Sequence, residues 1–329
     1  MHTPVGLLIF NRPEKTQQLV AEIAKAKPQK LFVIADGPRP MHPEDVAACA
    51  AARAVIDHVE WECEVVKQYS EVNLGCGRRP ATGISWVFEQ ADRAIILEDD
   101  CVPHPTFFRF CDELLEKYLD DKRIMQISGS NFQFDRLESP YSYYFTNLNP
   151  TWGWATWRRA WQHYDIAANI WPAFRKTSWV QDIVKNTRAA SYWESKFDLA
   201  YERRGEIDFW DYQWTLACWA QNGLSIIPTV NLVSNIGFGK DATHTVSSEG
   251  DKRAYLPSRA ISFPLEHPPF VIPNQEADRI CIEEAVLPLF PENVNSRSWF
   301  SRKWSDIVSD RPSLRDPRSF LKRLGIPFK

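Results

Sequence analysis

Short apolar runs alternate with amphipathic stretches through the first third of the chain. The apolar runs end in polar or turn-forming residues, as buried parallel strands do. Between them, apolar positions recur at helical spacing, for example Leu19, Val20 and Ile23. These patterns predict strands at 5–10, 31–35, 61–68 and 93–97, and helices at 14–26, 46–56, 82–90 and 106–118. Strands that alternate with helices are typical of a Rossmann-like α/β fold with a parallel sheet.

The pattern changes after residue 122. It predicts strands at 124–128 and 224–228, a helix at 210–221, and mixed or helical segments at 152–161 and 178–201. From residue 256 onward proline becomes more frequent and the spacing becomes irregular. We therefore predict two halves of one folding unit, 1–120 and 121–255, followed by a C-terminal extension at 256–329.

Three of the predicted strands end in polar or charged residues. Arg12 follows the first strand, Asp36 follows the second, and the acidic triplet Glu98-Asp99-Asp100 follows the fourth. Ligands of open parallel sheets bind beyond the carboxyl ends of the strands, so these side chains are predicted to share one site. No GxGxxG or GxxxxGK[ST] motif follows the first strand, which disfavours a dinucleotide-binding or P-loop protein.

The acidic triplet carries the clearest chemical signal. Three neighbouring carboxylates at the end of a buried strand repel one another, and a divalent cation offsets that repulsion. Oxygen ligands suit Mn²⁺ or Mg²⁺, and an ion held by one or two carboxylates keeps positions open for phosphate oxygens. Such an ion neutralises a departing nucleoside diphosphate. A solvated turn is the alternative, but the position after an apolar strand favours the metal site.

The segment around the triplet resembles a known enzyme family. Residues 95–108, Ile-Ile-Leu-Glu-Asp-Asp-Cys-Val-Pro-His-Pro-Thr-Phe-Phe, are similar to the hydrophobic-EDD-x-x-x-x-P-x-F-F stretch of N-acetylglucosaminyltransferase I and related GT-A glycosyltransferases. Further similar segments are Gly153-Trp154 with Trp161, Asp208-Phe209-Trp210-Asp211-Tyr212-Gln213-Trp214, and the loop 235–244. The resemblance spans roughly residues 4–245. It implies the GT-A fold of nucleotide-diphospho-sugar transferases, a mixed, mostly parallel sheet flanked by helices.

The resemblance also implies roles for the residues at the strand ends. Asp100 corresponds to the metal ligand, while Glu98 and Asp99 correspond to residues that contact the donor ribose and sugar. Arg12 and Asp36 stand where the first two strand ends of the family meet the nucleotide base and ribose. The luminal targeting segment and membrane anchor of the family have no counterpart in this sequence.

A base near the acceptor hydroxyl is the second requirement of glycosyl transfer. Asp211 is the candidate, because the resemblance places it at the catalytic base of an FWDDW segment, although this chain has Asp211-Tyr212-Gln213-Trp214 where the family has the one-residue-shorter Asp-Asp-Trp. Its neighbours Phe209, Trp210 and Trp214 are apolar residues of the kind that raises a carboxylate pKa. Direct displacement with one base predicts inversion at the anomeric carbon. A helix N-cap is the structural alternative, compatible with catalysis.

Other candidate residues are defined less closely. Lys240 and Thr243 lie in the loop that resembles a nucleotide-closing loop and are predicted to contact the donor; His244 is predicted to ligate the metal. A solvated loop is the alternative for all three. Arg79 follows the glycine-containing segment 75–77 and is predicted either to approach the phosphates or to belong to a solvated turn.

The chain contains fourteen tryptophans, many of them between residues 152 and 219. Aromatic rings stack on the apolar faces of pyranose rings, so Trp154 and Trp210 are predicted to stack on a sugar. Burial in the core is the alternative, and it suits most of the tryptophans.

Composition narrows the class of protein. Lys plus Arg number 39 against 42 Asp plus Glu, which leaves no basic surplus to indicate nucleic acid binding. Seven scattered cysteines without a CxxC pair argue against a disulfide framework and a structural zinc site, and they favour a reducing compartment. No signal-peptide pattern and no apolar run of ~20 residues is found, so a cytoplasmic location is predicted.

The segment 296–329 carries nine Lys or Arg against three Asp, together with five aromatic residues. It is predicted either to contact the inner face of an anionic membrane or to remain solvated.

Together these features predict a metal-dependent, inverting glycosyltransferase. It would move GlcNAc or another hexose from a UDP-sugar, bound by residues 1–120, to a glycan or lipid-linked acceptor, bound by residues 121–255, as in polysaccharide or lipopolysaccharide biosynthesis. A sugar nucleotidyltransferase is one alternative, but it usually has a glycine-rich basic loop where this chain has Asn11-Arg12-Pro13-Glu14. A non-catalytic carbohydrate-binding relative is the other, and it needs neither the triplet nor Asp211.

Overall fold

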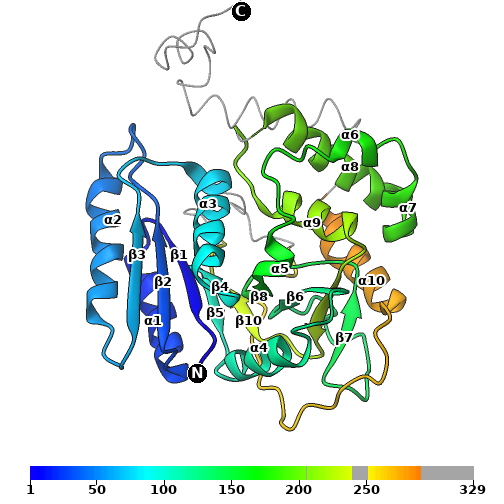
Figure 1. Cartoon of the computed structure of the whole chain (residues 1–329), viewed down its shortest axis with the longest axis horizontal. Helices are drawn as coiled ribbons and strands as arrows, with labels where there is room; N and C mark the ends of the chain where they lie inside the picture. The colour runs from blue at the N-terminus through cyan, green and yellow to red at the C-terminus, as the bar shows by residue number, and fades with distance from the viewer. Residues whose placement is uncertain (205, 239–250, 290–329) are drawn as a thin grey trace, which may run out of the picture. The chain divides into compact units, whose positions relative to one another are not determined.

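A mixed sheet organises residues Met1–Pro288, which form one compact unit (Figure 1). The computed structural model describes residues 1–204, 206–238 and 251–289. Within them the sheet has eight strands in the order β3-β2-β1-β4-β8-β6-β9-β7. The strands are β1 (Val5–Ile9), β2 (Lys30–Ala35), β3 (Glu64–Tyr69), β4 (Arg93–Glu98), β6 (Ile124–Ser128), β7 (Tyr143–Thr146), β8 (Trp154–Trp157) and β9 (Leu224–Pro228). All run in one direction except β8 and β7, which confirms the predicted α/β fold with a mixed, mostly parallel sheet.

Helices cover both faces of this sheet. They are α1 (Pro13–Ala26), α2 (Glu44–Val55), α3 (Gly75–Gln90), α4 (Thr106–Lys117), α5 (Arg158–Trp161), α6 (Trp171–Phe174), α7 (Trp179–Val184), α8 (Thr187–Arg203), α9 (Asp211–Ala220) and α10 (Gln275–Cys281). In the described part of the chain, none of them has the length and apolar character needed to cross a bilayer.

Alternate residues of each central strand face two different cores. In β2, Leu31 and Val33 pack in a core that contains α1 and α4, whereas Phe32 and Ile34 pack in a core that contains α3, α5 and α9. All four side chains are completely buried. Because both faces of the strand are covered, the sequence shows a continuous apolar run rather than an alternation.

A short two-stranded ribbon lies beside the end of β4. Its strands are β5 (Cys101–Pro103) and β10 (Val233–Asn235), which pair antiparallel with Asn235 opposite Cys101. The ribbon brings a segment of the second half next to the acidic triplet. The sequence analysis missed both strands because three residues are too few to establish a period.

The second half differs from the prediction in several places, and two of its elements, β7 and α6, were not predicted. Residues 152–161 form the strand β8 and only then the short helix α5; β8 lies between β4 and β6 and is completely buried, so its side chains show no alternation. Part of the predicted extension also belongs to the compact unit, since Pro273 bridges to Phe145 on β7 and Asp278 of α10 accepts hydrogen bonds from Asn147. The basic segment 296–329 lies outside the described residues.

Helix α3 begins at Gly75, earlier than the predicted start at residue 82. The Asp36 carboxylate accepts hydrogen bonds from the backbone N–H groups of Leu74 and Gly75, which stabilises the helix start where the glycine-rich sequence gave no helical signal. Gly77 packs against the segment that leads into α9: a Cβ there would lie 2.0 Å from the carbonyl oxygen of Ile207. This contact fixes the start of α9 over the first turn of α3.

We predict that Gly77→Ala destabilises the protein by about 1–3 kcal/mol, because the added methyl group must push the segment at Ile207 away. At an open helical position the same change would stabilise by roughly 0.5–1 kcal/mol. Denaturant unfolding of the variant, with Thr82→Ala on the exposed face of the same helix as control, measures the difference. A Gly77→Ala variant as stable as the wild type would contradict the packing described here.

Candidate active site

The carboxyl ends of β1, β2 and β4 meet at one edge of the sheet. In the parallel register, Leu8 of β1 lies beside Glu98 of β4, and Ile9 lies beside Ala35 of β2. The residues that follow these strands therefore come together, as the sequence predicted for Arg12, Asp36 and the acidic triplet.

Arg12 forms ion pairs with two members of the triplet. Its Nη1 lies 3.2 Å from Asp99 Oδ1 and 3.0 Å from Asp100 Oδ2. The second oxygen of Asp99 accepts a hydrogen bond from the backbone N–H of Phe10, at 3.3 Å. Burial disfavours the charged guanidinium, but the two carboxylates outweigh it and raise the pKa of Arg12. One cation thus joins the first strand end to the fourth.

The triplet is short of positive charge. Burial raises the pKa of Glu98 to about 8, and the charges of Asp100, Asp99 and Asp211 add to the shift. Burial also raises the pKa of Asp99 to about 6, although Arg12 acts in the opposite direction. At neutral pH these carboxyls therefore favour either a proton or a further cation.

The ribbon of β5 and β10 confines Asp100. The Asp100 carbonyl accepts a hydrogen bond from Ile236 N at 2.8 Å. A Cβ at Gly237 would lie only 2.0 Å from Asp100 Oδ2, so a glycine backbone passes directly against this carboxylate. Gly237 N donates to Asn235 Oδ1 at 2.7 Å, which fixes that backbone. Asp100 is therefore held facing Arg12.

Asp211 lies at the start of α9, within electrostatic range of Glu98 in the triplet. It is the first residue of the helix, and Trp210 occupies the N-cap position without a side-chain cap hydrogen bond, so the N-cap interpretation of Asp211 is wrong. The Asp211 charge contributes to the raised pKa of Glu98 and, after burial, to that of Tyr164, which shows that these groups lie within electrostatic range. Tyr192 and Tyr212, with hydroxyl oxygens 2.5 Å apart, complete its surroundings.

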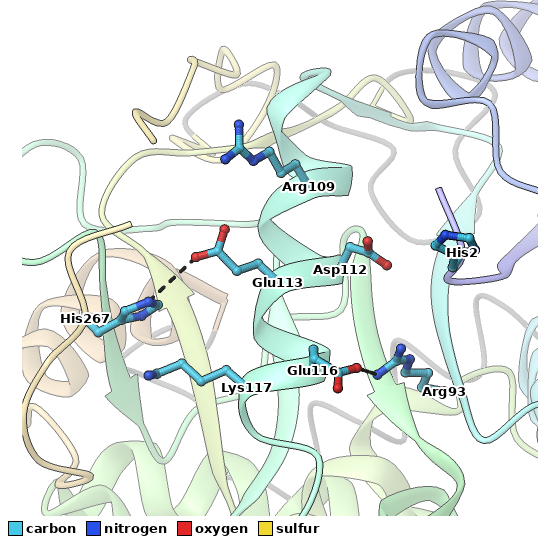
Figure 2. Close-up of a pocket in the computed structure, with 8 residues that line it drawn as sticks. All are labelled: His2, Arg93, Arg109, Asp112, Glu113, Glu116, Lys117 and His267. Atoms are coloured by element: carbon cyan, nitrogen blue, oxygen red, sulfur yellow. Dashed lines mark hydrogen bonds and ion pairs between the residues drawn. The ribbon is translucent and has the colours of Figure 1, made fainter. Parts of the chain in front are cut away.

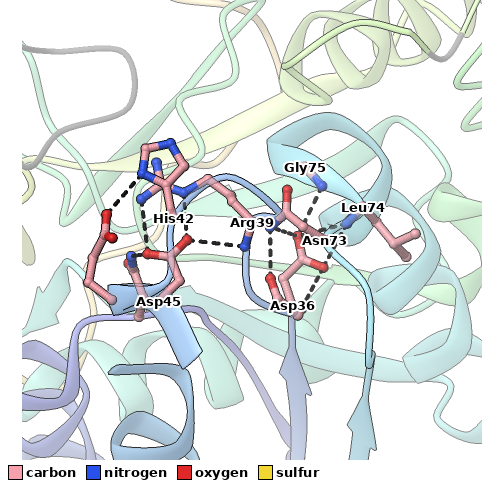
Figure 3. Close-up of polar contacts among 10 residues, drawn as sticks. Asp36, Arg39, His42, Asp45, Asn73, Leu74 and Gly75 are labelled. Carbon is pink, nitrogen blue, oxygen red and sulfur yellow. Dashed lines mark hydrogen bonds and ion pairs between the residues drawn. The ribbon is translucent and has the colours of Figure 1, made fainter. Parts of the chain in front are cut away.

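Asp36 holds the loop before α3. Its carboxylate accepts hydrogen bonds from the N–H groups of Gly37, Leu74 and Gly75 and from the Asn73 amide, at 2.9 to 3.2 Å (Figure 3). Burial raises the pKa of Asp36 against the effect of these bonds. Both oxygens are occupied, so the structure gives Asp36 an anchoring role where the sequence predicted a nucleotide contact.

A second charged pair at the same edge was not predicted. Arg39 binds Asp45 through Nε at 2.6 Å and through Nη2 at 3.0 Å, and Asn11 Nδ2 donates to Asp45 at 2.7 Å (Figure 3). The Asp45 side chain is almost completely buried. Asn11 and Arg39 lie in loops and Asp45 lies in the first turn of α2, and no sequence motif connects them.

Arg79 is buried within α3 and does not form a solvated turn. Its Nη1 donates to Gln68 Oε1 at 3.0 Å, and its Nη2 donates to the Gln68 carbonyl. Burial lowers the pKa of Arg79 against the attraction of Asp36. The guanidinium is bound to the end of β3, which corrects the prediction of a phosphate contact.

The predicted sugar-stacking residues belong to the core. Trp154 is completely buried and packs against Trp210, Trp161 and Trp214, with its ring centroid 5.6 to 6.0 Å from theirs. Trp210 is only 5% exposed. Because Trp154 has no free ring face and Trp210 very little, both predictions of sugar stacking are corrected to packing roles.

Lys240, Thr243 and His244 lie outside the described residues. Of the loop that was predicted to close over the nucleotide, residues 235–238 are described, and they pack against Asp100 as noted above.

A hollow on the exposed side of α4 lies at the opposite edge of the sheet (Figure 2). His2, before β1, and Arg93, the first residue of β4, contribute to it. Its walls carry mixed charge, with Arg93 paired to Glu116 at 2.5 Å and His267 3.6 Å from Glu113. Because it opens at the amino ends of the strands, it is separate from the edge where the triplet lies.

No family model and no curated protein matches this chain. Similar solved structures include the inositol-1-phosphate CTP transferase from T. maritima, with 8% identity, a TM-score of 0.38, and coverage of 75% of this chain and 93% of that chain. Mouse xyloside xylosyltransferase 1 in its apo form shows 10% identity and a TM-score of 0.34 over 79% of this chain and 96% of that chain. UDP-glucose pyrophosphorylase complexed with UDP-glucose shows 12% identity and a TM-score of 0.30 over 50% and 79%.

We predict that Glu98→Gln changes the pH dependence of stability. The folded pKa of Glu98, about 8, lies above its ordinary value of 4.5, so the contribution of Glu98 to stability is fully present below pH 4.5 and is lost as the pH rises through the folded pKa. The amide has no charge to bury, so the variant should gain roughly 1 kcal/mol or more relative to wild type between pH 5 and pH 8.

Denaturant unfolding at several pH values in EDTA measures this difference. The exposed Asp120, replaced by Asn, provides the control. Parallel stability curves for the wild type and Glu98→Gln would contradict a raised Glu98 pKa.

Proposed function

We propose that this chain is a metal-dependent, inverting glycosyltransferase that moves a sugar from a UDP-sugar to a glycan or lipid-linked acceptor. One observation carries the proposal. Asp99 and Asp100 converge on a single cationic position at the end of a parallel strand, while Asp211 lies close enough for its charge to raise the pKa of Glu98. This arrangement supports a leaving diphosphate and an acceptor hydroxyl bound side by side.

The donor set suits Mn²⁺ or Mg²⁺. Asp99 Oδ1 and Asp100 Oδ2 both reach one point, since a single nitrogen of Arg12 lies 3.2 and 3.0 Å from them. Among the described residues, no group of three or more His, Cys, Asp or Glu side chains is arranged to hold a metal. Mg²⁺ is commonly held by only one or two carboxylates together with substrate phosphates. When bound, such an ion neutralises the charge on the departing diphosphate.

The side chains around that position have separate roles in the transfer reaction. Asp211, on the first turn of α9, accepts the proton of the acceptor hydroxyl. Glu98 precedes Asp99 and Asp100 at the end of β4 and contacts the donor ribose or sugar. A single base that acts directly on the acceptor hydroxyl implies direct displacement, and hence inversion at the anomeric carbon.

The two alternative functions fit these observations less well. Helix α1 begins at Pro13, directly after Arg12, so the described chain has no glycine-rich basic loop of the kind a sugar nucleotidyltransferase uses. A non-catalytic carbohydrate-binding protein would present its tryptophans, but Trp154 and Trp210 are buried. We therefore favour transfer, with GlcNAc or another hexose as the sugar and assembly of a polysaccharide or lipopolysaccharide in the cytoplasm as the setting.

We predict that Asp211→Asn lowers turnover by about 10²–10⁴-fold, because the amide cannot accept the proton of the attacking hydroxyl. Its affinity for UDP should stay close to that of the wild type. The measurement is UDP release from UDP-GlcNAc and other UDP-hexoses, with water or an offered glycan as acceptor. Glu206→Gln, an exposed carboxylate near the same helix start, is the matched control.

Two results would contradict the proposal. One is an Asp211→Asn variant that turns over as fast as Glu206→Gln. The other is a wild-type product whose anomeric configuration, determined by NMR, matches that of the donor.

A further inference from the structure

Arg12 occupies the position between the carboxylates of Asp99 and Asp100. The same Nη1 atom makes both contacts, at 3.2 and 3.0 Å. A guanidinium that binds one carboxylate usually presents two nitrogens to its two oxygens. Here the NH₂ group of one nitrogen, Nη1, donates to two different carboxylates, which is the geometry of a shared cation. The side chains are largely buried, with 18% of Arg12, 8% of Asp99 and 17% of Asp100 exposed.

The chain fixes Arg12 at this position from its own backbone. Arg12 is the N-cap residue of α1, and its carbonyl accepts hydrogen bonds from Thr16 N and Thr16 Oγ1, both at 2.9 Å. The N–H of Phe10 binds Asp99 Oδ2. The backbone before α1 is therefore attached both to the helix and to the triplet.

Asp100 cannot easily turn away from Arg12. Gly237 passes so close that a Cβ would lie 2.0 Å from Asp100 Oδ2, and this is the same oxygen that faces Arg12 Nη1. On its other side, Cys101 Sγ lies 3.7 Å from Asp100 Oδ1. A divalent cation that binds Asp100 Oδ2 and Asp99 Oδ1 must therefore take the place of the Arg12 nitrogen.

We infer that Arg12 is an internal counter-cation that competes with the divalent metal for Asp99 and Asp100 and so makes metal binding depend on a nucleoside diphosphate. This inference rests on the proposed function. A bare metal ion must displace Arg12 and leave a largely buried guanidinium without its carboxylates, which is unfavourable. A metal bound to a diphosphate brings anionic oxygens that offer Arg12 new partners. The metal and the nucleotide are thereby coupled.

Mn²⁺ binding, followed by electron paramagnetic resonance, tests this inference without any turnover. The titration uses Mn²⁺ alone and then Mn²⁺ with saturating UDP, on the wild type, Arg12→Gln, Arg12→Lys and Arg39→Gln. Arg39→Gln removes another guanidinium at the same edge of the sheet, one that pairs with Asp45 instead of the triplet. Circular dichroism and unfolding curves establish that each variant is folded.

Arg12→Gln should bind Mn²⁺ alone at least about 10-fold more tightly than the wild type, and UDP should improve its affinity for Mn²⁺ less than it does for the wild type. Arg12→Lys, which keeps a cation at the site, and Arg39→Gln should resemble the wild type. If UDP enhances Mn²⁺ binding to the wild type but Arg12→Gln binds Mn²⁺ alone no more tightly, the inference fails and the proposed function stands. If Mn²⁺ binds to neither the wild type nor Arg12→Gln, with or without UDP, both fail.

Discussion

Three carboxyl groups crowd together at the buried end of β4, and the electrostatics of the site depend on that crowding. Burial disfavours the ionised forms of Glu98 and Asp99, and repulsion from the neighbouring carboxylates adds to the effect, so their pKa values are raised to about 8 and about 6. Arg12 reduces the electrostatic repulsion between the carboxylates because it forms ion pairs with two of the three, Asp99 and Asp100. A cluster of this kind contributes little to the stability of the fold. Because its negative charges are only partly neutralised, it binds cations and protons. On the proposed function, this cluster receives an anionic ligand together with a metal.

The scaffold positions partners around the cluster through close backbone contacts. Asp36 binds the start of α3, and Gly77 in the first turns of that helix packs against the segment before Asp211. On the other side, the ribbon of β5 and β10 brings Gly237 against Asp100. Residues from both halves of the chain therefore surround the end of β4. The contact between α3 and the segment before α9 occurs at Gly77, and the contact with Asp100 occurs at Gly237. A side chain at either glycine would push the two contacting segments apart.

The sequence was most informative where burial and topology act together. Strands buried on both faces appear as unbroken apolar runs, and parallel strands end at one edge, so the meeting of Arg12 with the triplet followed from the pattern. Periodicity could not reveal β5 and β10, which have three residues each, or β8, whose four residues are all buried.

Side-chain partners were harder to predict than side-chain locations. Asp36 and Arg79 lie near the predicted edge of the sheet. However, Asp36 binds backbone N–H groups and Arg79 binds Gln68, and these partners are distant in sequence. The tryptophans show the same limit. Nothing in the composition distinguishes a ring that stacks on a sugar from one that stacks on another ring, as Trp154 and Trp210 do at 5.6 Å.

The measurement that tests the central claim most directly is a calorimetric titration of UDP, GDP, dTDP and CDP into the protein with Mn²⁺ and with EDTA. It is repeated on Asp100→Ala and on Asp120→Ala, whose exposed side chain follows the end of α4. The account predicts that UDP binds only with Mn²⁺, that Asp100→Ala abolishes this binding, and that Asp120→Ala retains it. Binding of UDP that needs no metal and survives Asp100→Ala, or no binding of any of the four nucleotides, would contradict a metal-dependent sugar transferase with its site at the acidic triplet.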